Sequence, residues 1–451
     1  MSYANTEAQG VTLAGTLTVP PGKGPFPAVL LVPGSGPHDR DETLLGHKVF
    51  LVLADYLTRK GIVVLRVDDR GVGKSTGQFA NATTADLATD AEAGVAYLKT
   101  LSEVDPHKVG VIGHSEGGLI APMVAARNAD VAFIVMMAGP GVAGDEILLE
   151  QGLLKSEAAG ASPAAAEKAA ASRRELLLLV KQEKDNALLE KELREKLAGL
   201  PEAQINAQIK QLTSPWFRYF IAYDPAAALQ KVKCPVLALN GEKDLQVPPK
   251  QNLPAIRKAL QEGGNQHVEI DELPGLNHLF QTAKTGAPSE YGEIEETMSP
   301  VAMEKIATWI LMEPKPVGVF NVLSTTYVPE GNYDHAIQDY TEAIRQNPQS
   351  ASAFPSRGSA YLDKGDYDQA VQDFNQAIRL DPQSASALNG RGYAYFAKGN
   401  YDPAVRLRDP RGRLTYPTTW DARDRLRPYR LSRPAAAGVT DKPKPAGVEC
   451  I

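Results

Sequence analysis

Val109-Gly110-Val111-Ile112-Gly113-His114-Ser115-Glu116-Gly117 is the stretch of this 451-residue chain that decides its fold. Its first four residues form an apolar run that predicts a buried strand, and residues 116–127 that follow predict a helix. Ser115 therefore stands at a tight strand-to-helix junction. Such a turn needs neighbours without side chains, here Gly113 and Gly117, and it pushes the serine hydroxyl out beyond the sheet edge. The pattern indicates a nucleophilic serine.

Strands and helices alternate on both sides of this junction. The predicted strands cover residues 11–19, 28–32, 62–67, 109–112, 131–137, 235–239 and 268–273, and the predicted helices cover 44–59, 84–101, 116–127, a segment after Pro249, and 299–311. Apolar strands that alternate with helices are typical of a parallel sheet buried on both faces. The sequence thus predicts an α/β domain over residues 1–312.

The alternation is interrupted between Asp145 and Lys233. This segment is rich in Ala, Leu, Glu and Lys and has no β-branched runs, so we expect a helical cap at residues 145–233, inserted into the α/β domain. Its later part holds Trp216, Phe217 and Phe220. These aromatic side chains either line a substrate pocket or pack the cap on the core, and the sequence leaves both readings open.

A periodic segment follows a linker predicted at residues 313–316. Gly331, Gly365 and Gly399 lie 34 residues apart, and tyrosines and alanines keep the same step. A period of 34 residues resembles the tetratricopeptide repeat, in which helical hairpins stack on one another. We expect two to three repeats over residues 317–405, the third incomplete.

The last segment, residues 406–451, differs in composition from the rest. It carries nine Arg and two Lys against five acidic residues, a charge of +6, whereas the preceding residues carry −12 and the whole chain −6. With six prolines and no periodic apolar face, this tail is expected to be disordered. Binding of a polyanion by the tail is one hypothesis, and a shifted reading of the gene end is another.

Composition excludes several classes of function. Hydrophobic residues at 43% and charged residues at 23% are typical of a globular protein, and the mild net charge argues against a dedicated nucleic-acid binder. No apolar run reaches the roughly 18 residues of a membrane span. Cys234 and Cys450 are too few for a disulfide framework or a metal cluster, so we expect no metal and no cofactor. The chain is predicted to be cytoplasmic, or periplasmic or secreted if a leader and a first strand are missing.

Three motifs together resemble the α/β-hydrolase superfamily. They are the junction around Ser115, residues 34–42 (Gly-Ser-Gly-Pro-His-Asp-Arg-Asp-Glu) and residues 68–75 (Asp-Asp-Arg-Gly-Val-Gly-Lys-Ser). The resemblance covers residues 11–312 and is to bacterial serine esterases of the dienelactone hydrolase and prolyl oligopeptidase group. It implies a mostly parallel sheet with helices on both faces, and a serine where dienelactone hydrolases carry cysteine.

The same resemblance implies the order serine, acid, histidine along the chain. His278 lies on a loop beyond the last predicted strand, at the carboxyl edge where such sheets bind ligands, and we expect it to be the base. Asp244 follows the preceding strand and is the expected acid, with Glu242 as its neighbour in competition. The histidines 38, 47, 107 and 114 are expected to be ordinary hydrogen-bonding loop residues.

A tetrahedral intermediate also needs hydrogen-bond donors for its oxyanion. By the resemblance, the backbone N–H of Glu116 supplies one donor, and that of Ser35 or Gly36 supplies the other. Arg40 and Arg70 are expected to support this loop by pairing with Asp39 or Asp69.

These residues predict a serine hydrolase that cleaves a small-molecule carboxylic ester through an acyl-enzyme. An acyl-CoA thioesterase or a small-peptide hydrolase would use the same residues. A hypothesis of another class is an interaction scaffold, because tetratricopeptide repeats bind proteins or mediate self-association.

Overall fold

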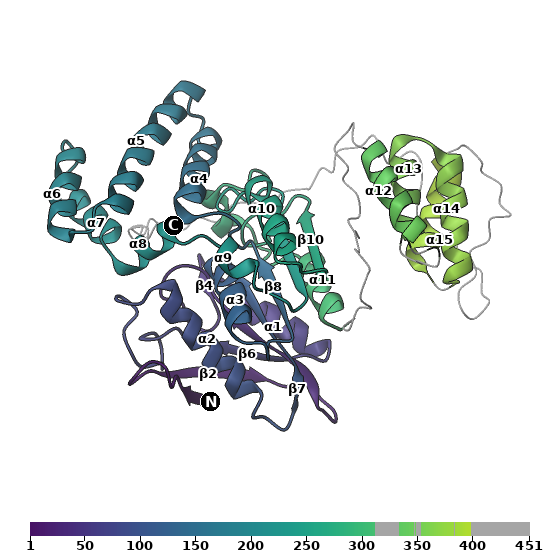
Figure 1. Cartoon of the computed structure of the whole chain (residues 1–451), viewed down its shortest axis with the longest axis horizontal. Coiled ribbons are helices and arrows are strands. Elements are labelled where there is room, and N and C mark those ends of the chain that lie inside the picture. The colour runs from purple at the N-terminus through teal and green to yellow at the C-terminus, as the bar shows by residue number, and fades with distance from the viewer. Residues whose placement is uncertain (312–332, 347, 349–352, 383, 398–451) are drawn as a thin grey trace, which may run out of the picture. The chain divides into compact units, whose positions relative to one another are not determined.

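The computed structural model describes residues 1–311, 333–346, 348, 353–382 and 384–397. The described residues form two compact units, one up to residue 311 and one from residue 333 onward (Figure 1). The predicted linker at 313–316, the opening of the first repeat, the end of the third repeat and the tail at 406–451 lie outside the described residues.

An eight-stranded sheet forms the middle of the first unit, in the order β1-β2-β6-β3-β7-β8-β9-β10. Its strands are β1 (Ser2–Ala4), β2 (Thr12–Thr18), β3 (Phe26–Val32), β6 (Val63–Val67), β7 (Val104–His114), β8 (Phe133–Met137), β9 (Val236–Gly241) and β10 (Val268–Leu273). Pairing is antiparallel between β1, β2 and β6 and parallel from β6 through β10. The predicted mostly parallel sheet is confirmed, and β1 precedes the strand that the sequence indicated first.

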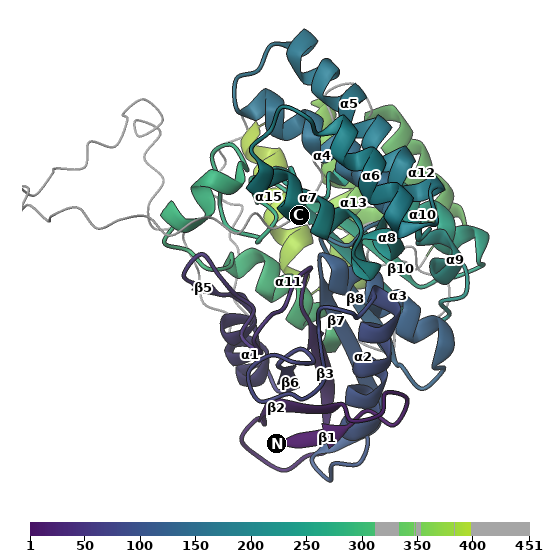
Figure 2. The ribbon, with the colours of Figure 1, turned by 90° about the vertical axis from the view of Figure 1, so that its left-hand side faces the viewer.

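Helices cover both faces of this sheet. α1 (Val49–Arg59) and α11 (Pro300–Leu311) pack on one face, and α2 (Thr84–Leu98), α3 (Glu116–Arg127) and α10 (Pro249–Glu262) pack on the other (Figure 2). Strand β3 serves both layers because its side chains alternate, with Ala28, Leu30 and Val32 in one cluster and Val29 and Leu31 in the other. Each such buried Leu or Val contributes roughly 1.5–3 kcal/mol, which explains the continuous apolar runs of the sequence.

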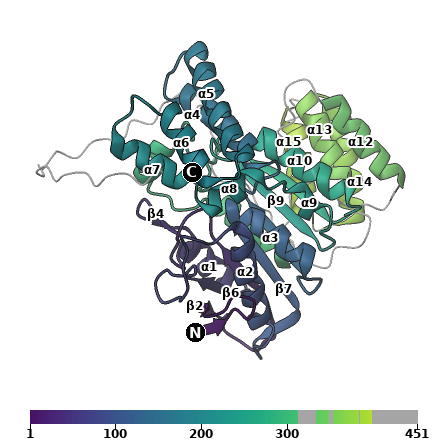
Figure 3. The ribbon, with the colours of Figure 1, turned by 60° about the vertical axis from the view of Figure 1, so that its left-hand side comes forward.

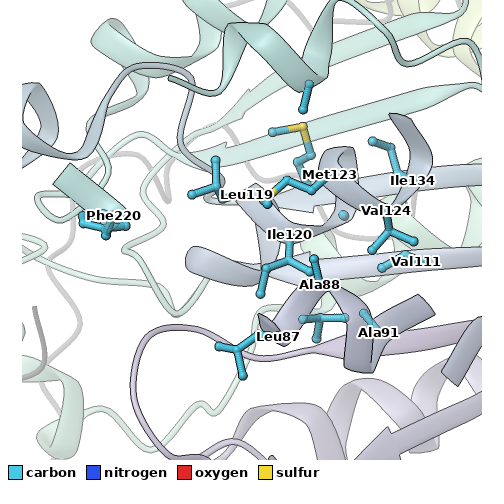
Figure 4. Packing of buried hydrophobic residues seen from close by; sticks show 14 of the residues in the cluster. Leu87, Ala88, Ala91, Val111, Leu119, Ile120, Met123, Val124, Ile134 and Phe220 are labelled. Carbon is cyan, nitrogen blue, oxygen red and sulfur yellow. The ribbon is translucent and has the colours of Figure 1, made fainter. Parts of the chain in front are cut away.

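The layer of α2 and α3 is the more extensive of the two. Figure 4 shows Leu87 and Ala91 of α2 together with Ile120 of α3 and Val111 of β7. This layer fixes α3, and therefore the junction at Ser115, against the sheet.

One predicted boundary is wrong, because the helix predicted from Leu44 begins only at Val49. The residues before it form a short hairpin of two strands, β4 (Thr43–Leu44) and β5 (His47–Lys48), each two residues long. Its turn, Leu45-Gly46, has φ values of 50° and 90°. Two successive positive φ angles match the twist of a tight hairpin and cannot belong to a right-handed helix.

Six helices lie between β8 and β9, where the sequence predicts the cap. They are α4 (Gly144–Ala158), α5 (Pro163–Gln182), α6 (Asn186–Lys196), α7 (Glu202–Leu212), α8 (Pro215–Ala222) and α9 (Ala226–Leu229), and most of them extend away from the sheet (Figure 3). Ser162 and Ser214 cap α5 and α8 through their side chains, each followed by proline at the first helical position.

The second unit consists of helical hairpins. α12 (Tyr333–Gln346), α13 (Ala353–Lys364), α14 (Tyr367–Leu380) and α15 (Ala385–Ala397) follow one another in the predicted period. A Cβ atom at Gly390 would lie 2.4 Å from the ring of Phe374, so this glycine lets α15 approach α14. Arg357 and Asp373 also join α13 to α14 through two hydrogen bonds of 2.8 Å. In the part of the chain described here, no helix is long and apolar enough to cross a membrane.

Candidate active site

Ser115 connects the last residue of β7 to the first residue of α3. Its φ of 53° and ψ of −115° lie in a region that L-residues rarely adopt. A Cβ at Gly113 would lie 1.8 Å from the carbonyl oxygen of Gly117, and a Cβ at Gly117 would lie 2.1 Å from that of Val32. The two glycines therefore permit the close packing of α3 on β7 and β3 that this strained turn requires.

The structure brings Ser115, His278 and Asp244 together at the carboxyl ends of the parallel strands. His278 Nε2 lies 3.1 Å from Ser115 Oγ, and His278 Nδ1 lies 2.8 Å from Asp244 Oδ2. His278 comes from the loop that follows β10, and Asp244 comes from the loop that follows β9. Both side chains are buried. Because Asp244 accepts from Nδ1, the neutral ring presents the lone pair of Nε2 to the serine hydroxyl.

Asp244 is held by further donors. Its Oδ1 accepts from the backbone N–H groups of Gln246 and Val247 at 2.8 and 2.9 Å, and its Oδ2 also accepts from Asn240 at 3.2 Å. The competing carboxylate, Glu242, points elsewhere and accepts from the Gly275 N–H at 2.7 Å. Asp244 is thus the carboxylate that orients the imidazole.

The loop after β3 lies beside Ser115. A Cβ at Gly34 would approach the Cβ of Ser115 to 3.2 Å. The Gly34 N–H already donates to Glu42 at 2.8 Å, which leaves Ser35 and Gly36 as the donor candidates of this loop. Gly36 has a φ of 108°, a conformation that favours glycine.

The predicted arginine pairings are wrong. Arg40 Nη2 lies 2.6 Å from Asp68 and Arg70 Nε lies 2.6 Å from Asp90, instead of pairing with Asp39 or Asp69. Asp68 follows β6, the strand that pairs with β3, and Asp90 lies on α2. Each pair therefore connects two separate elements. Pairing with the residue adjacent in sequence would have fixed only the loop to itself.

Glu116 connects the nucleophile turn to the inserted helices. Its Oε1 accepts hydrogen bonds of 2.7 Å from Trp216 Nε1 of α8 and from Thr84 Oγ1 of α2. Burial raises the pKa of the Glu116 carboxyl, and the hydrogen bonds that it accepts oppose this effect. The sequence did not indicate this contact, since Trp216 lies 100 residues away.

The other two aromatic residues of the predicted pocket are packed in the interior. Phe217 and Phe220 are 3% and 7% exposed and belong to the cluster of α2 and α3. Trp216 is half-buried and stacks on Phe220 with ring centroids 5.4 Å apart. Burial of this kind is typical of cap-to-core packing, with Trp216 as the residue nearest the nucleophile turn.

A histidine–carboxylate pair that the sequence did not indicate lies beside these residues. His114 was expected to be an ordinary loop residue, but its Nδ1 lies 2.8 Å from Glu42 Oε1 and its Nε2 lies 3.0 Å from the carbonyl oxygen of His278. Only the position of His114 next to Ser115 could have drawn attention to it. Across the described ranges, no group of His, Cys, Asp and Glu side chains could hold a metal ion.

Asp69 lines a small cavity beside the loop after β3. The cavity has a volume of about 40 Å³, and Gly34 and Asp90 also line it. Burial raises the pKa of Asp69 well above the ordinary carboxyl range, and the negative charges of Glu116 and Asp90 add to this effect. The His38 N–H, which donates to Asp69 at 2.8 Å, opposes it.

We expect Asp69→Asn to make the fold less sensitive to rising pH. The folded protein holds a proton on Asp69 at a pH where the unfolded chain, with a pKa of about 3.9, has lost it. Stability is therefore lost as pH rises from about 4 through the raised folded-state pKa. Asparagine keeps an acceptor for the His38 N–H and does not titrate.

Urea unfolding of both proteins from pH 5 to pH 8 checks this. The free energy of unfolding of the variant should fall less than that of the wild type and should equal or exceed it at pH 8. Asp105→Asn is the control, because Asp105 accepts a backbone N–H in the same way, from His107 at 3.0 Å, near the start of β7, where it is only partly buried. Parallel pH profiles for Asp69→Asn and the wild type would contradict the prediction.

Comparisons with known proteins give the family of the chain. Residues 9–271 match the profile of a family described as X-Pro dipeptidyl-peptidase (S15 family), and residues 326–365 and 358–399 match the TPR repeat. The chain is 30% identical over 303 residues to the esterase EstD of Thermotoga maritima, covering 66% of this chain and 65% of that relative. This chain therefore spans less than two thirds of that relative's length.

Two solved structures are similar to part of the chain. Est1E of Butyrivibrio proteoclasticus, with bound ferulic acid, is 18% identical, with 69% of this chain and 98% of that chain covered and a TM-score of 0.41. An esterase of Pyrococcus furiosus is 18% identical, with 61% and 81% covered and a TM-score of 0.41. The family match and the repeat match confirm the two resemblances inferred from the sequence.

Proposed function

The chain belongs to the X-Pro dipeptidyl-peptidase (S15) family, and on that premise we propose that it is a serine hydrolase that cleaves carboxylic esters. The observation that carries the proposal is the hydrogen-bonded series from Asp244 through His278 to Ser115, with distances of 2.8 and 3.1 Å. Such a series converts an unreactive hydroxyl into a nucleophile. The similarity to an esterase supports esters as the substrate class.

The reaction proceeds in two halves. Ser115 Oγ attacks the ester carbonyl while His278 Nε2 takes its proton, and Asp244 stabilises the resulting imidazolium. The backbone N–H groups of Glu116 and of Ser35 or Gly36 donate to the oxyanion. His278 then protonates the leaving alcohol, and an acyl-enzyme remains. In the second half, His278 takes a proton from water, the water oxygen attacks the acyl-enzyme carbonyl, and His278 returns the proton to Ser115 Oγ as the carboxylic acid leaves.

The inserted helices α4 to α9 form a cap over this site in our proposal. The hydrogen bond from Trp216 to Glu116 supports it, since it joins α8 to the residue that follows the nucleophile. The half-buried indole of Trp216 is then the pocket wall, and Phe217 and Phe220 hold it from behind.

Two other reactions use the same residues with a different leaving group. An acyl-CoA thioesterase would release a thiol, and a peptidase would release an amine, as the description of the family suggests. An amine is a poorer leaving group than an alcohol and depends more on protonation by His278.

We therefore expect ester turnover to exceed amide turnover by about 100-fold or more in kcat/KM. The full chain is assayed with p-nitrophenyl esters of increasing acyl length, with acyl-CoA thioesters and with Xaa-Pro p-nitroanilides. Preferential cleavage of the Xaa-Pro anilides would contradict the ester proposal in favour of the peptidase. Preferential cleavage of acyl-CoA would favour the thioesterase.

The tetratricopeptide repeats give the chain a second candidate role, binding a protein or another copy of itself. The helical hairpins α12 to α15 support it, because such units bind partners on their surfaces. The substrate panel and light scattering are repeated with a chain that ends at residue 316. An unchanged number of chains per particle would contradict self-association, and unchanged kcat/KM would assign the repeats to partner binding rather than catalysis. The cytoplasmic location inferred from the sequence stays a prediction.

A further inference from the structure

His114 and Glu42 form a buried pair that the proposed reaction does not use. His114 is the last residue of β7, and Glu42 lies in the loop between β3 and β4. Their side chains are 4% and 3% exposed, and Nδ1 and Oε1 are 2.8 Å apart. Because both groups are removed from water, their protonation is decided by the atoms that surround them.

Both ring nitrogens of His114 face acceptors. Nδ1 faces Glu42 Oε1, and Nε2 faces the carbonyl oxygen of His278 at 3.0 Å. A carbonyl oxygen has no proton to give, and Glu42 Oε1 already accepts from the Gly34 N–H. With an ionised Glu42, the imidazole satisfies both contacts when each nitrogen carries a proton, which makes the pair an imidazolium and a carboxylate.

Glu42 balances this charge. Burial alone would lower the pKa of His114, but the charge and hydrogen bond of Glu42 raise it. Burial alone would raise the pKa of Glu42, but the charge and hydrogen bond of His114 lower it. Glu42 Oε2 is buried and has no hydrogen-bond partner within the described residues, so compensation of the carboxylate depends on its Oε1 contacts.

The pair joins the three segments that meet at the site. Glu42 Oε1 fixes Gly34 of the oxyanion loop, His114 precedes the nucleophile in the chain, and its Nε2 holds the backbone of the base loop at His278. The rings of His114 and His278 have centroids only 4.9 Å apart. The charged ring of His114 would therefore lie directly beside the imidazole that we propose as the base.

We propose that Glu42 and His114 are positioning residues that fix the oxyanion loop and the base loop on the nucleophile turn and place a buried positive charge beside His278. This inference rests on the proposed ester hydrolysis. The two charges of the pair balance each other, and the positive one is the charge that faces the ring of His278.

Other charged groups face this pair from the neighbouring elements. Asp244, from the loop after β9, favours a proton on His114. His38, from the loop after β3, favours the ionised form of Glu42, and Asp69, from the loop after β6, feels the negative charge of Glu42. The test must therefore change the pair and leave these groups in place.

Glu42→Gln is the isosteric test. An amide oxygen can still accept from the Gly34 N–H, but without the carboxylate the buried imidazolium loses its counter-charge and becomes neutral. The variant loses both charges of the pair, and the lost charge that faces His278 is the positive one, with ring centroids 4.9 Å apart, so the acid limb of kcat/KM for p-nitrophenyl ester hydrolysis should move to higher pH by roughly half a unit. An acid limb that coincides with that of the wild type would overturn the proposal.

His47→Gln is the matched control. His47 is also buried, and its ring contacts Thr297 Oγ1 at 3.1 Å and the carbonyl oxygen of Tyr291 at 2.9 Å without touching His278. Its replacement should leave the acid limb in place. A shift equal to that of Glu42→Gln would indicate general loosening of the fold and would also overturn the proposal.

A second measurement needs neither a variant nor activity. In the full wild-type chain labelled with ¹⁵N-histidine, both ring nitrogens of His114 should carry protons from pH 5 to pH 8, assigned by loss of the signal in His114→Gln. A singly protonated His114 at pH 7 overturns the inference whatever the activity. A doubly protonated His114 in a protein without ester turnover would instead contradict the proposed function and leave the ion pair standing.

Discussion

Ser115→Ala should reduce ester turnover by at least about 10³-fold, because removal of Oγ leaves no atom to form the acyl-enzyme. The residual rate would come from substrate binding and oxyanion stabilisation alone. Stability should hardly change. Alanine has the same backbone preferences as serine at the φ of 53°, and the hydroxyl makes a single side-chain contact, 3.1 Å to His278.

The measurement is kcat/KM for a p-nitrophenyl ester, with the urea midpoint measured on the same preparation. Ser172→Ala is the control, since Ser172 lies on the surface of α5 and bonds only to the carbonyl oxygen of Lys168. Turnover by Ser115→Ala within tenfold of the wild type would contradict both the nucleophile and the acyl-enzyme. A lower urea midpoint with proportionate loss of activity would point to damage of the turn instead.

Gly113→Ala should have the largest effect on the fold itself. The new Cβ would lie 1.8 Å from the carbonyl oxygen and 2.1 Å from the carbonyl carbon of Gly117. These are backbone atoms in the first turn of α3, so no rotamer change can relieve the overlap, and the helix must move from the sheet. We expect a loss of about 3 kcal/mol or more in the free energy of unfolding, with little folded protein recovered.

Gly160→Ala separates steric overlap from backbone strain. Gly160 has a φ of 84°, and a Cβ there would meet no atom within 4 Å. Its replacement should cost only the left-handed backbone penalty of about 1–2 kcal/mol. Urea unfolding of the two variants gives the comparison. Equal losses would show that overlap with Gly117 does not control the packing of the nucleophile turn.

Most of the architecture could be predicted from the sequence because its signals are local. The apolar run at Val109 to Ile112 reports a strand buried on both faces, and the glycines around Ser115 report the tight turn, without knowledge of any distant residue. The 34-residue step of the repeats is similarly visible in one dimension. The hairpin at residues 43–48 was missed because its apolar residues fit a helical pattern, and only the positive φ angles of Leu45 and Gly46 exclude it.

The residues expected to act in catalysis also follow from position along the chain. Strand ends in a parallel sheet gather at one edge, so Ser115, Asp244 and His278 could be singled out by the strands that they follow. The same logic could not choose between Ser35 and Gly36 as the oxyanion donor, because their strand position is the same. It also gave Arg40 and Arg70 the wrong partners, because adjacency in sequence says little about a side chain as long as that of arginine.

Local residue patterns are enough to predict the alternation of strands and helices, the tight turn at Ser115 and the repeats, since each is encoded in residues that are close together. Which buried charges and polar groups meet can be read only from the folded chain. Arg40 and Asp68, His114 and Glu42, and Trp216 and Glu116 are separated by 28, 72 and 100 residues. A buried polar group must find a partner wherever the packing of loops places one, and that placement depends on the whole fold rather than on any local pattern.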